Sequence, residues 1–139
     1  MNIPEIVGMT HSKVLSRFHY TSDKKNYDKM EDWRSHAKEV NEGKEFKDDC
    51  DGFALTCAEL ILTGGVDRSR VKIIICKTET GEQHLVCGVD IDDDPDFGKT
   101  TYICDNRQGT VKAWSEMHGY EWQYFMKMSE PGQWSEVIR

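Results

Sequence analysis

Residues 46–60 read FKDDCDGFALTCAEL, a stretch in which a cysteine, Cys50, lies among aspartates where a helical pattern begins. Apolar residues recur at helical spacing after it, the acids before it supply N-cap chemistry, and Gly64 and Gly65 provide a stop signal. We therefore predict a helix that begins at or next to Cys50. The first turn of a helix favours an anion because the aligned peptide dipoles leave a partial positive charge there. A thiolate would be stabilised at that position, which makes Cys50 a candidate nucleophile.

The size and composition of the chain predict one globular domain over residues 1–139. Hydrophobic residues make up 37% and charged residues 31% of the sequence, which is too apolar for a disordered chain. No run of about 18 apolar residues is present, so we expect no membrane span. A formal net charge of -7 without a basic stripe argues against nucleic-acid binding.

The cysteines and the first residues of the chain bear on the cellular compartment. The five cysteines are an odd number without a CxxC pair, and four of them fall in apolar segments where thiols behave as small buried hydrophobes. The first 18 residues lack a secretory signal pattern. We expect a cytoplasmic protein, or a periplasmic or secreted one if a signal was removed.

The remaining pattern predicts helices first and strands second. Apolar spacing indicates helices over residues 3–18 and 27–40, before the helix that starts at Cys50. Runs rich in β-branched and aromatic residues then predict strands at 71–76, 84–91, 100–105 and 121–128. This order is typical of an α+β fold in which N-terminal helices pack on an antiparallel sheet.

A histidine and an aspartate occupy neighbouring ends of two predicted strands. His84 starts one strand, on the face opposite Leu85, Cys87 and Val89, and Asp105 ends the next strand. Antiparallel pairing of these strands would bring the carboxylate beside the imidazole ring. Cys50, His84 and Asp105 are therefore our candidate catalytic residues.

These three residue types suit amide hydrolysis through a thioester. His84 would activate the thiol and later protonate the leaving amine, Asp105 would orient the ring, and the Cys50 amide would be one oxyanion donor. The sequence does not identify a second donor. The acids around Cys50 oppose a thiolate by charge repulsion, so they must either turn away to cap the helix or bind a hard cation such as Ca²⁺.

Three motifs resemble the bacterial transglutaminase-like cysteine peptidases: DDCDGFAL at 48–55, HLVCGVD at 84–90 and YICDNRQG at 102–109. The segment GYEWQYFMKMSEPGQW at 119–134 is similar to the aromatic closing hairpin of that family. The resemblance implies a papain-like or transglutaminase-like fold, cleavage of a protein or peptide by Cys50, His84 and Asp105, and Ca²⁺ held by Asp49 and Asp51. It also implies that Trp33 packs over the active site.

One departure from that family lies directly after the cysteine. Two acids commonly follow the family's cysteine, whereas Asp51 is followed here by Gly52. Amide hydrolysis by Cys50, His84 and Asp105 itself requires no cofactor, so a bound Ca²⁺ would not take part in the bond-breaking steps.

The same residues are compatible with other functions. DCDGF also resembles the start of NlpC-type peptidases, which cut cell-wall peptides but usually have a second histidine where this chain has Asp105. An acyl transferase or deamidase of the transglutaminase type, or a non-catalytic Ca²⁺-dependent binding module, would share the pattern. The histidines other than His84 are interpreted as surface or satisfied residues, and the acidic run at 90–98 as a solvated loop.

Overall fold

A computed structural model describes residues 2–21, 34–91 and 101–137 of the chain. Its centre is a six-stranded sheet with the order β6-β5-β4-β3-β7-β8, in which every neighbouring pair is antiparallel. The strands are β3 (Val71–Lys77), β4 (Gln83–Asp90), β5 (Thr101–Cys104), β6 (Lys112–Ala113), β7 (Glu121–Lys127) and β8 (Trp134–Glu136). The predicted α+β class with an antiparallel sheet is confirmed.

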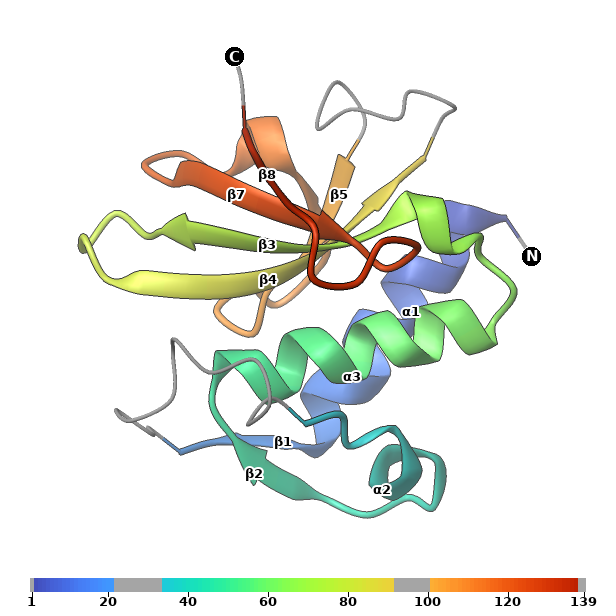
Figure 1. Cartoon of the computed structure of the whole chain (residues 1–139). Coiled ribbons are helices and arrows are strands. Elements are labelled where there is room, and N and C mark those ends of the chain that lie inside the picture. Colours follow the sequence, from blue (N-terminus) through green and yellow to red (C-terminus); the bar gives the residue numbers. More distant parts are fainter. Residues whose placement is uncertain (1, 22–33, 92–100, 138–139) are drawn as a thin grey trace.

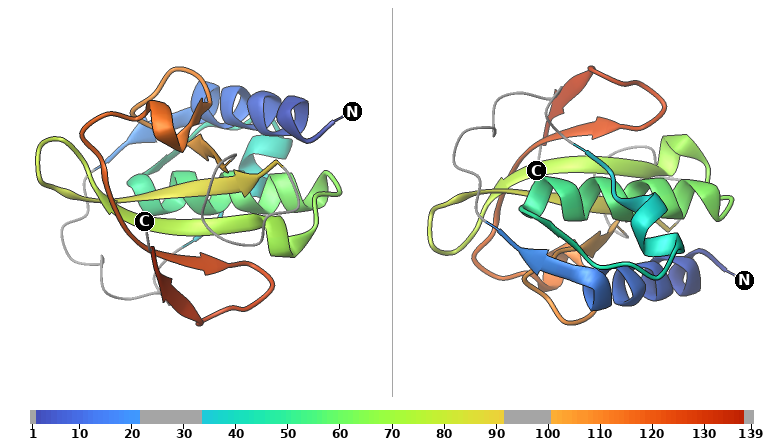
Figure 2. Two further views of the ribbon diagram at one scale, coloured as in Figure 1. Left: turned by 90° about the horizontal axis from the view of Figure 1, so that it is seen from above. Right: turned by 90° about the horizontal axis from the view of Figure 1, so that it is seen from below.

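The helices cover one face of this sheet (Figure 1). Helices α1 (Ile3–Arg17) and α3 (Cys50–Thr63) pack on the sheet, and α2 (Ala37–Asn41) packs on these two helices. The short 3-10 turns are η2 (Arg68–Arg70) and η3 (Trp114–Glu116). Figure 2 shows α1 and α3 side by side in front of the sheet when the molecule is seen from below. A small parallel pair, β1 (Phe18–Tyr20) and β2 (Phe46–Asp48), leads the chain into α3.

Helix α3 begins at Cys50, as the capping pattern predicts. The side chain of Asp49 accepts a hydrogen bond from the Asp51 amide at 3.1 Å, which satisfies one of the first-turn donors that lack intrahelical partners. Gly64 is the C-cap residue. Three successive turns of α3 bury Phe53, Cys57 and Ile61, so the helix is held by packing along its whole length.

The sheet separates two hydrophobic clusters. Leu85, Cys87 and Val89 of β4 face the helices, whereas Val86 packs on the opposite face with Ile74 and neighbouring apolar residues. The predicted alternation along β4 is therefore confirmed. The opposite face is nevertheless buried as well, because large side chains from the segment through η3 pack there against those of β7.

The predicted helix over residues 27–40 is wrong over its described part between Arg34 and His36, since α2 starts only at Ala37. The reason is competition from side chains. The His36 amide donates to Thr56 Oγ1 of α3 at 2.8 Å, and the Ser35 hydroxyl donates to Glu59. Trp33 and most of the acidic run at 90–98 lie outside the described residues.

Within residues 2–21, 34–91 and 101–137, no helix combines the length and the hydropathy needed to cross a bilayer.

Candidate active site

Strands β4 and β5 bring His84 and Asp105 together. The strands pair with Cys87 opposite Cys104, so Asp105, one residue beyond the end of β5, reaches the start of β4. His84 Nε2 donates to Asp105 Oδ1 at 2.7 Å, and both side chains are buried. Because Nε2 is bonded to the carboxylate, Nδ1 is the ring nitrogen left to act on a thiol.

The Asp105 carboxylate is held by two further donors. The hydroxyl of Tyr120 donates to Oδ2 at 2.6 Å, and the Arg107 amide donates to Oδ1 at 2.9 Å. Burial would raise the pKa of Asp105, but the hydrogen bonds from His84, Tyr120 and the Arg107 amide outweigh it and hold that pKa below its usual value. The carboxylate is therefore ionised at neutral pH.

A histidine from α1 contacts the same residue from the helix side. His11 is buried, its Nε2 donates to the backbone carbonyl of Asp105 at 3.0 Å, and its ring meets Phe53 of α3 edge-on. Burial lowers the pKa of His11, which keeps the ring neutral. His11 is thus a satisfied residue that ties α1 to the Asp105 backbone.

Cys50 lies at the N-terminus of α3 with 1% of its surface exposed. Its Sγ donates to Asp51 Oδ1 at 3.6 Å. Burial raises the pKa of Cys76 on β3, and the negative charge of Asp105 raises it further. The Cys76 Sγ in turn donates to the His84 carbonyl at 3.6 Å.

The three acids beside Cys50 have different partners. The Asp48 carboxylate has two partners: its Oδ2 accepts from His36 Nε2 at 2.8 Å and its Oδ1 accepts from the Asp49 amide at 2.7 Å. Asp49 caps α3, and Asp51 faces the Cys50 sulfur. Of the predicted alternatives, capping of the helix therefore holds for Asp49, whereas Asp48 bonds to His36 and to the Asp49 amide and Asp51 stays beside the thiol.

Gly52 lies directly beneath the Asp48 carboxylate. A Cβ atom built at this position would overlap the Cβ and the carboxyl group of Asp48. The absence of a side chain at 52 is thus what allows Asp48 to reach His36 and the Asp49 amide.

A polar hollow of about 380 Å³ opens beside the imidazole. It is lined by Tyr20, Thr78, Thr80, Glu82, Gln83, His84, Asn106 and Arg107. A substrate chain placed there would lie against His84.

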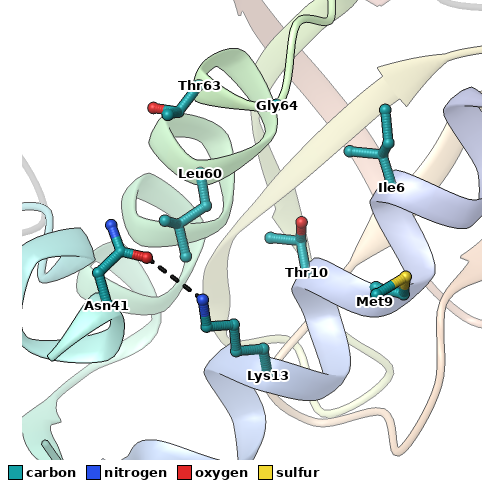
Figure 3. A pocket seen from close by; sticks show the side chains of 8 residues that line it. All are labelled: Ile6, Met9, Thr10, Lys13, Asn41, Leu60, Thr63 and Gly64. Carbon is teal, nitrogen blue, oxygen red and sulfur yellow. Dashed lines mark hydrogen bonds between the residues drawn. The ribbon is translucent and has the colours of Figure 1, made fainter. Parts of the chain in front are cut away.

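A larger hollow of about 530 Å³ lies elsewhere, between α1, α2 and the end of α3, where Lys13 Nζ donates to Asn41 Oδ1 at 3.2 Å (Figure 3). None of the candidate catalytic residues lines this larger hollow, so it is not part of the candidate active site.

Sequence reasoning missed His11, Tyr120 and Arg107. For His11 a signal exists, because Val7, His11 and Val14 recur at helical spacing and share one buried face of α1. Arg107 follows the Asp105-Asn106 pair directly, but nothing in the sequence indicates where its side chain points. Tyr120 contacts Asp105 across a separation of 15 residues, and that contact depends on the path of the chain through η3.

The fold matches solved structures of LapG from Legionella pneumophila. The calcium-bound form has a TM-score of 0.65 at 16% identity over 97% of this chain and 77% of that one. An EGTA-treated form gives 0.66 at 16% identity over 99% and 73%, and a third LapG structure gives 0.61 at 18% identity over 90% and 70%. No curated protein sequence matches the chain. The chain thus has the transglutaminase-like fold.

The family follows from the sequence itself. Residues 5–139 match the family described as bacterial transglutaminase-like cysteine proteinase BTLCP. The chain belongs to this family, and it is a cysteine peptidase that acts on protein substrates.

Proposed function

We propose that the peptidase works through Cys50 as nucleophile, His84 as general base and acid, and Asp105 as the group that orients His84. The observation that carries this assignment is the buried 2.7 Å hydrogen bond from His84 Nε2 to Asp105 Oδ1. This hydrogen bond supports an N–H at Nε2, so that in the neutral ring Nδ1 is the nitrogen that can accept a thiol proton.

In the first half of the reaction, the Cys50 sulfur attacks the carbonyl carbon of a peptide bond while its proton passes to His84. The negative charge that develops on the carbonyl oxygen is stabilised by the Cys50 amide, since first-turn amides lack intrahelical acceptors. The C–N bond then breaks, His84 gives its proton to the leaving amine, and a thioester remains on Cys50. Water activated by His84 hydrolyses the thioester and releases the acid.

The test is the reactivity of Cys50 towards iodoacetamide at neutral pH, followed residue by residue by mass spectrometry. We expect Cys50 to be alkylated at least about ten times faster than Cys57, a thiol of the same helix whose pKa is raised by burial. The advantage of Cys50 should disappear in His84→Ala. Equal rates for the two cysteines in the native protein would overturn the assignment.

Turnover is measured with fluorescein-labelled casein. Cys50→Ala and His84→Ala should abolish cleavage, whereas Cys57→Ala, which removes a core thiol, should leave it in place. Purified cell wall as a second substrate separates a general peptidase from a cell-wall peptidase. Full activity in Cys50→Ala would end the proposal.

We also propose that Asp49 and Asp51 are oxygen ligands of Ca²⁺. Both carboxylates are buried, with 4% of each residue exposed, and Ca²⁺ binds such hard oxygens. A bound cation would offset the negative charge of Asp51 beside the Cys50 thiol, which otherwise opposes the thiolate. The described ranges contain no cluster of three His, Cys, Asp or Glu residues arranged for a metal, so backbone or water oxygens must complete the shell.

The metal proposal is tested by the melting temperature, which does not depend on turnover. We expect Ca²⁺ to raise Tm relative to EGTA in the native protein but not in Asp49→Ala or Asp51→Asn, because only the folded state binds the ion. Asp67→Asn, at an exposed 3-10 cap, is the matched control. Identical melting of the native protein in Ca²⁺ and EGTA would contradict the proposal.

A cytoplasmic location is proposed on the state of the thiols. None of the five cysteines, all of which lie in the described part of the chain, forms a disulfide, as is usual in a reducing compartment. Fractionation of the source cells, with the protein followed by antibody, tests this: detection outside the cytoplasm would contradict it.

A further inference from the structure

The hydroxyl of Tyr120 lies between the Asp105 carboxylate and the Arg107 guanidinium. It donates to Asp105 Oδ2 at 2.6 Å and accepts from Arg107 Nη1 at 2.9 Å. A guanidinium only donates hydrogen bonds and an ionised carboxylate only accepts them. The direction of the hydroxyl proton is therefore fixed, and it points at Asp105.

Arg107 is itself held by an ion pair with Glu79. Its Nη1 donates to Glu79 Oε2 at 3.0 Å and its Nη2 pairs with Glu79 Oε1, in the two-pronged geometry that suits a carboxylate. The guanidinium carbon lies 5.7 Å from the centre of the Tyr120 ring. Glu79, in the β3–β4 connection, thus holds the group that orients the tyrosine.

Tyr120 affects His84 through the Asp105 carboxylate, to which both side chains are hydrogen-bonded. With Oδ2 taken by Tyr120, Oδ1 accepts from His84 Nε2 at 2.7 Å and from the Arg107 amide at 2.9 Å. The ring of Tyr120 also meets the His84 ring edge-on, at 6.3 Å between centroids. Tyr120 therefore limits both the rotation of the carboxylate and the position of the imidazole.

We propose that Tyr120, oriented by Arg107, is a positioning residue of the peptidase: it keeps Asp105 ionised and turned so that His84 carries its ring proton on Nε2. This inference rests on the proposed roles of His84 and Asp105. Tyr120 acts through Asp105 and does not itself contact the reacting atoms.

The charge states agree with this geometry. Burial raises the pKa of Tyr120, and the neighbouring Asp105 raises it further, so the hydroxyl keeps its proton at neutral pH. The hydrogen bond from Tyr120 is one of those that hold the pKa of Asp105 below its usual value against the effect of burial. Removal of the hydroxyl therefore raises the Asp105 pKa.

The decisive variant is Tyr120→Phe, which keeps the ring and its contacts with His84 and Trp122 while it removes the donor. We expect kcat on labelled casein to fall by about 10-fold or more, the size of one hydrogen bond to a charged group, with KM changed less than about twofold. The acid limb of the pH profile should move to higher pH. Tyr124→Phe, on the exposed part of β7, is the control that should change neither.

A coupling experiment separates positioning from a structural role. If Arg107 acts through the tyrosine hydroxyl, Arg107→Gln lowers kcat in the native background but has less than about a twofold effect when added to Tyr120→Phe. If the fold-changes in kcat of the two single variants multiply in the double variant, Arg107 does not act through the Tyr120 hydroxyl and the proposal is overturned.

A measurement without turnover distinguishes failure of this inference from failure of the peptidase proposal. The ¹⁵N spectrum of the His84 ring reports which nitrogen carries the proton, and we expect the Nε2–H form in the native protein and a mixture of forms in Tyr120→Phe. An unchanged spectrum and unchanged kcat in Tyr120→Phe overturn the role of Tyr120. If Cys50→Ala still cleaves casein, the proposed function fails while the ring spectrum continues to test Tyr120.

Discussion

A buried aspartate is paired with a buried basic side chain near each end of strand β4, and the two aspartates are held differently. At its start, His84 bonds to Asp105 at 2.7 Å; at its end, Asp90 lies 2.9 Å from Lys72 Nζ. Asp105 accepts from two more donors, and its pKa lies below the usual value. Burial raises the pKa of Asp90, although Lys72 and a 2.8 Å hydrogen bond from Thr101 oppose the shift.

The difference shows that burial alone does not set the state of a carboxylate. Both aspartates are almost fully covered, with 0% and 3% of the residue exposed, so desolvation acts on both. The outcome is decided by the donors: for Asp105 they outweigh desolvation, and for Asp90 they do not. The donors around Asp105 thus favour its ionised form. The donors around Asp90 do not fully offset its burial, so an ionised Asp90 lowers the stability of the fold.

The largest effect is expected from Lys72→Met, which leaves Asp90 buried without its cation. Breaking a buried pair on one side typically costs about 3–5 kcal/mol of unfolding free energy. Urea denaturation measures this loss. The double variant Lys72→Met/Asp90→Leu, which removes both charges, should recover most of it. A single variant within about 1 kcal/mol of the native protein would show that the two ends of β4 do not differ in this way.

Asp105→Asn should act mainly on activity. The amide keeps the shape of the carboxylate but can present a donor to His84 Nε2, which favours the wrong ring tautomer. We expect kcat on labelled casein to fall by about 100-fold or more, with weak residual cleavage. Asp67→Asn, at the cap of η2, is the control and should retain native kcat. Retention of kcat by Asp105→Asn would remove Asp105 from the site.

The dependence of stability on pH should have opposite signs for the two aspartates. The folded-state pKa of Asp105 is lowered, so its contribution is present above the unfolded value of about 3.9 and is lost as pH falls through the folded pKa. The folded-state pKa of Asp90 is raised, so its cost to stability applies at neutral pH and is relieved as pH falls through that pKa.

Urea unfolding between pH 7 and pH 3 tests these signs. Relative to the native protein, the destabilisation caused by Asp105→Asn should shrink in acid, whereas Asp90→Asn should become relatively less stable in acid. The same sign of change for both variants would contradict the comparison.

The smallest effect on stability is expected from Glu79→Gln, which breaks the exposed pair with Arg107. The hydrogen bonds from Arg107 lower the pKa of Glu79 to about 2, but the glutamate is exposed and its charge is screened by salt. Thermal melting in physiological salt should show no change in Tm outside experimental error. A drop as large as that of Lys72→Met would mean that exposure does not separate these pairs.

The sequence predicts the parts of the fold that depend on interactions between residues close together in the chain. Helix α3 follows from the cap at Asp49 and the stop at Gly64, and β3 and β4 follow from apolar runs between turns. The three-residue strands β1 and β2 were not predicted, because their parallel pairing joins Phe18 to Phe46 and depends on how α1 and α3 pack. The predicted start of the helix that precedes α3 is wrong because the Thr56 side chain, in α3, accepts a hydrogen bond from the His36 amide.

The candidate site divides in the same manner. The predicted pairing of His84 with Asp105 is confirmed. Antiparallel pairing of the two strands is enough to bring the start of β4 beside the end of β5. Their supports, Tyr120 and Arg107, could not be predicted because a side chain that crosses from one loop to another leaves no periodic signal. The role of Cys50 stays a prediction.

Gly52 limits which neighbouring sequences this active-site helix can tolerate. Any side chain there would displace the Asp48 carboxylate and so release both His36 and the Asp49 amide. A second acid after the cysteine and the contact between Asp48 and His36 are therefore alternatives that one chain cannot combine. A relative with an acid at the position of Gly52 should have lost the histidine partner as well, and the two positions should change together during evolution.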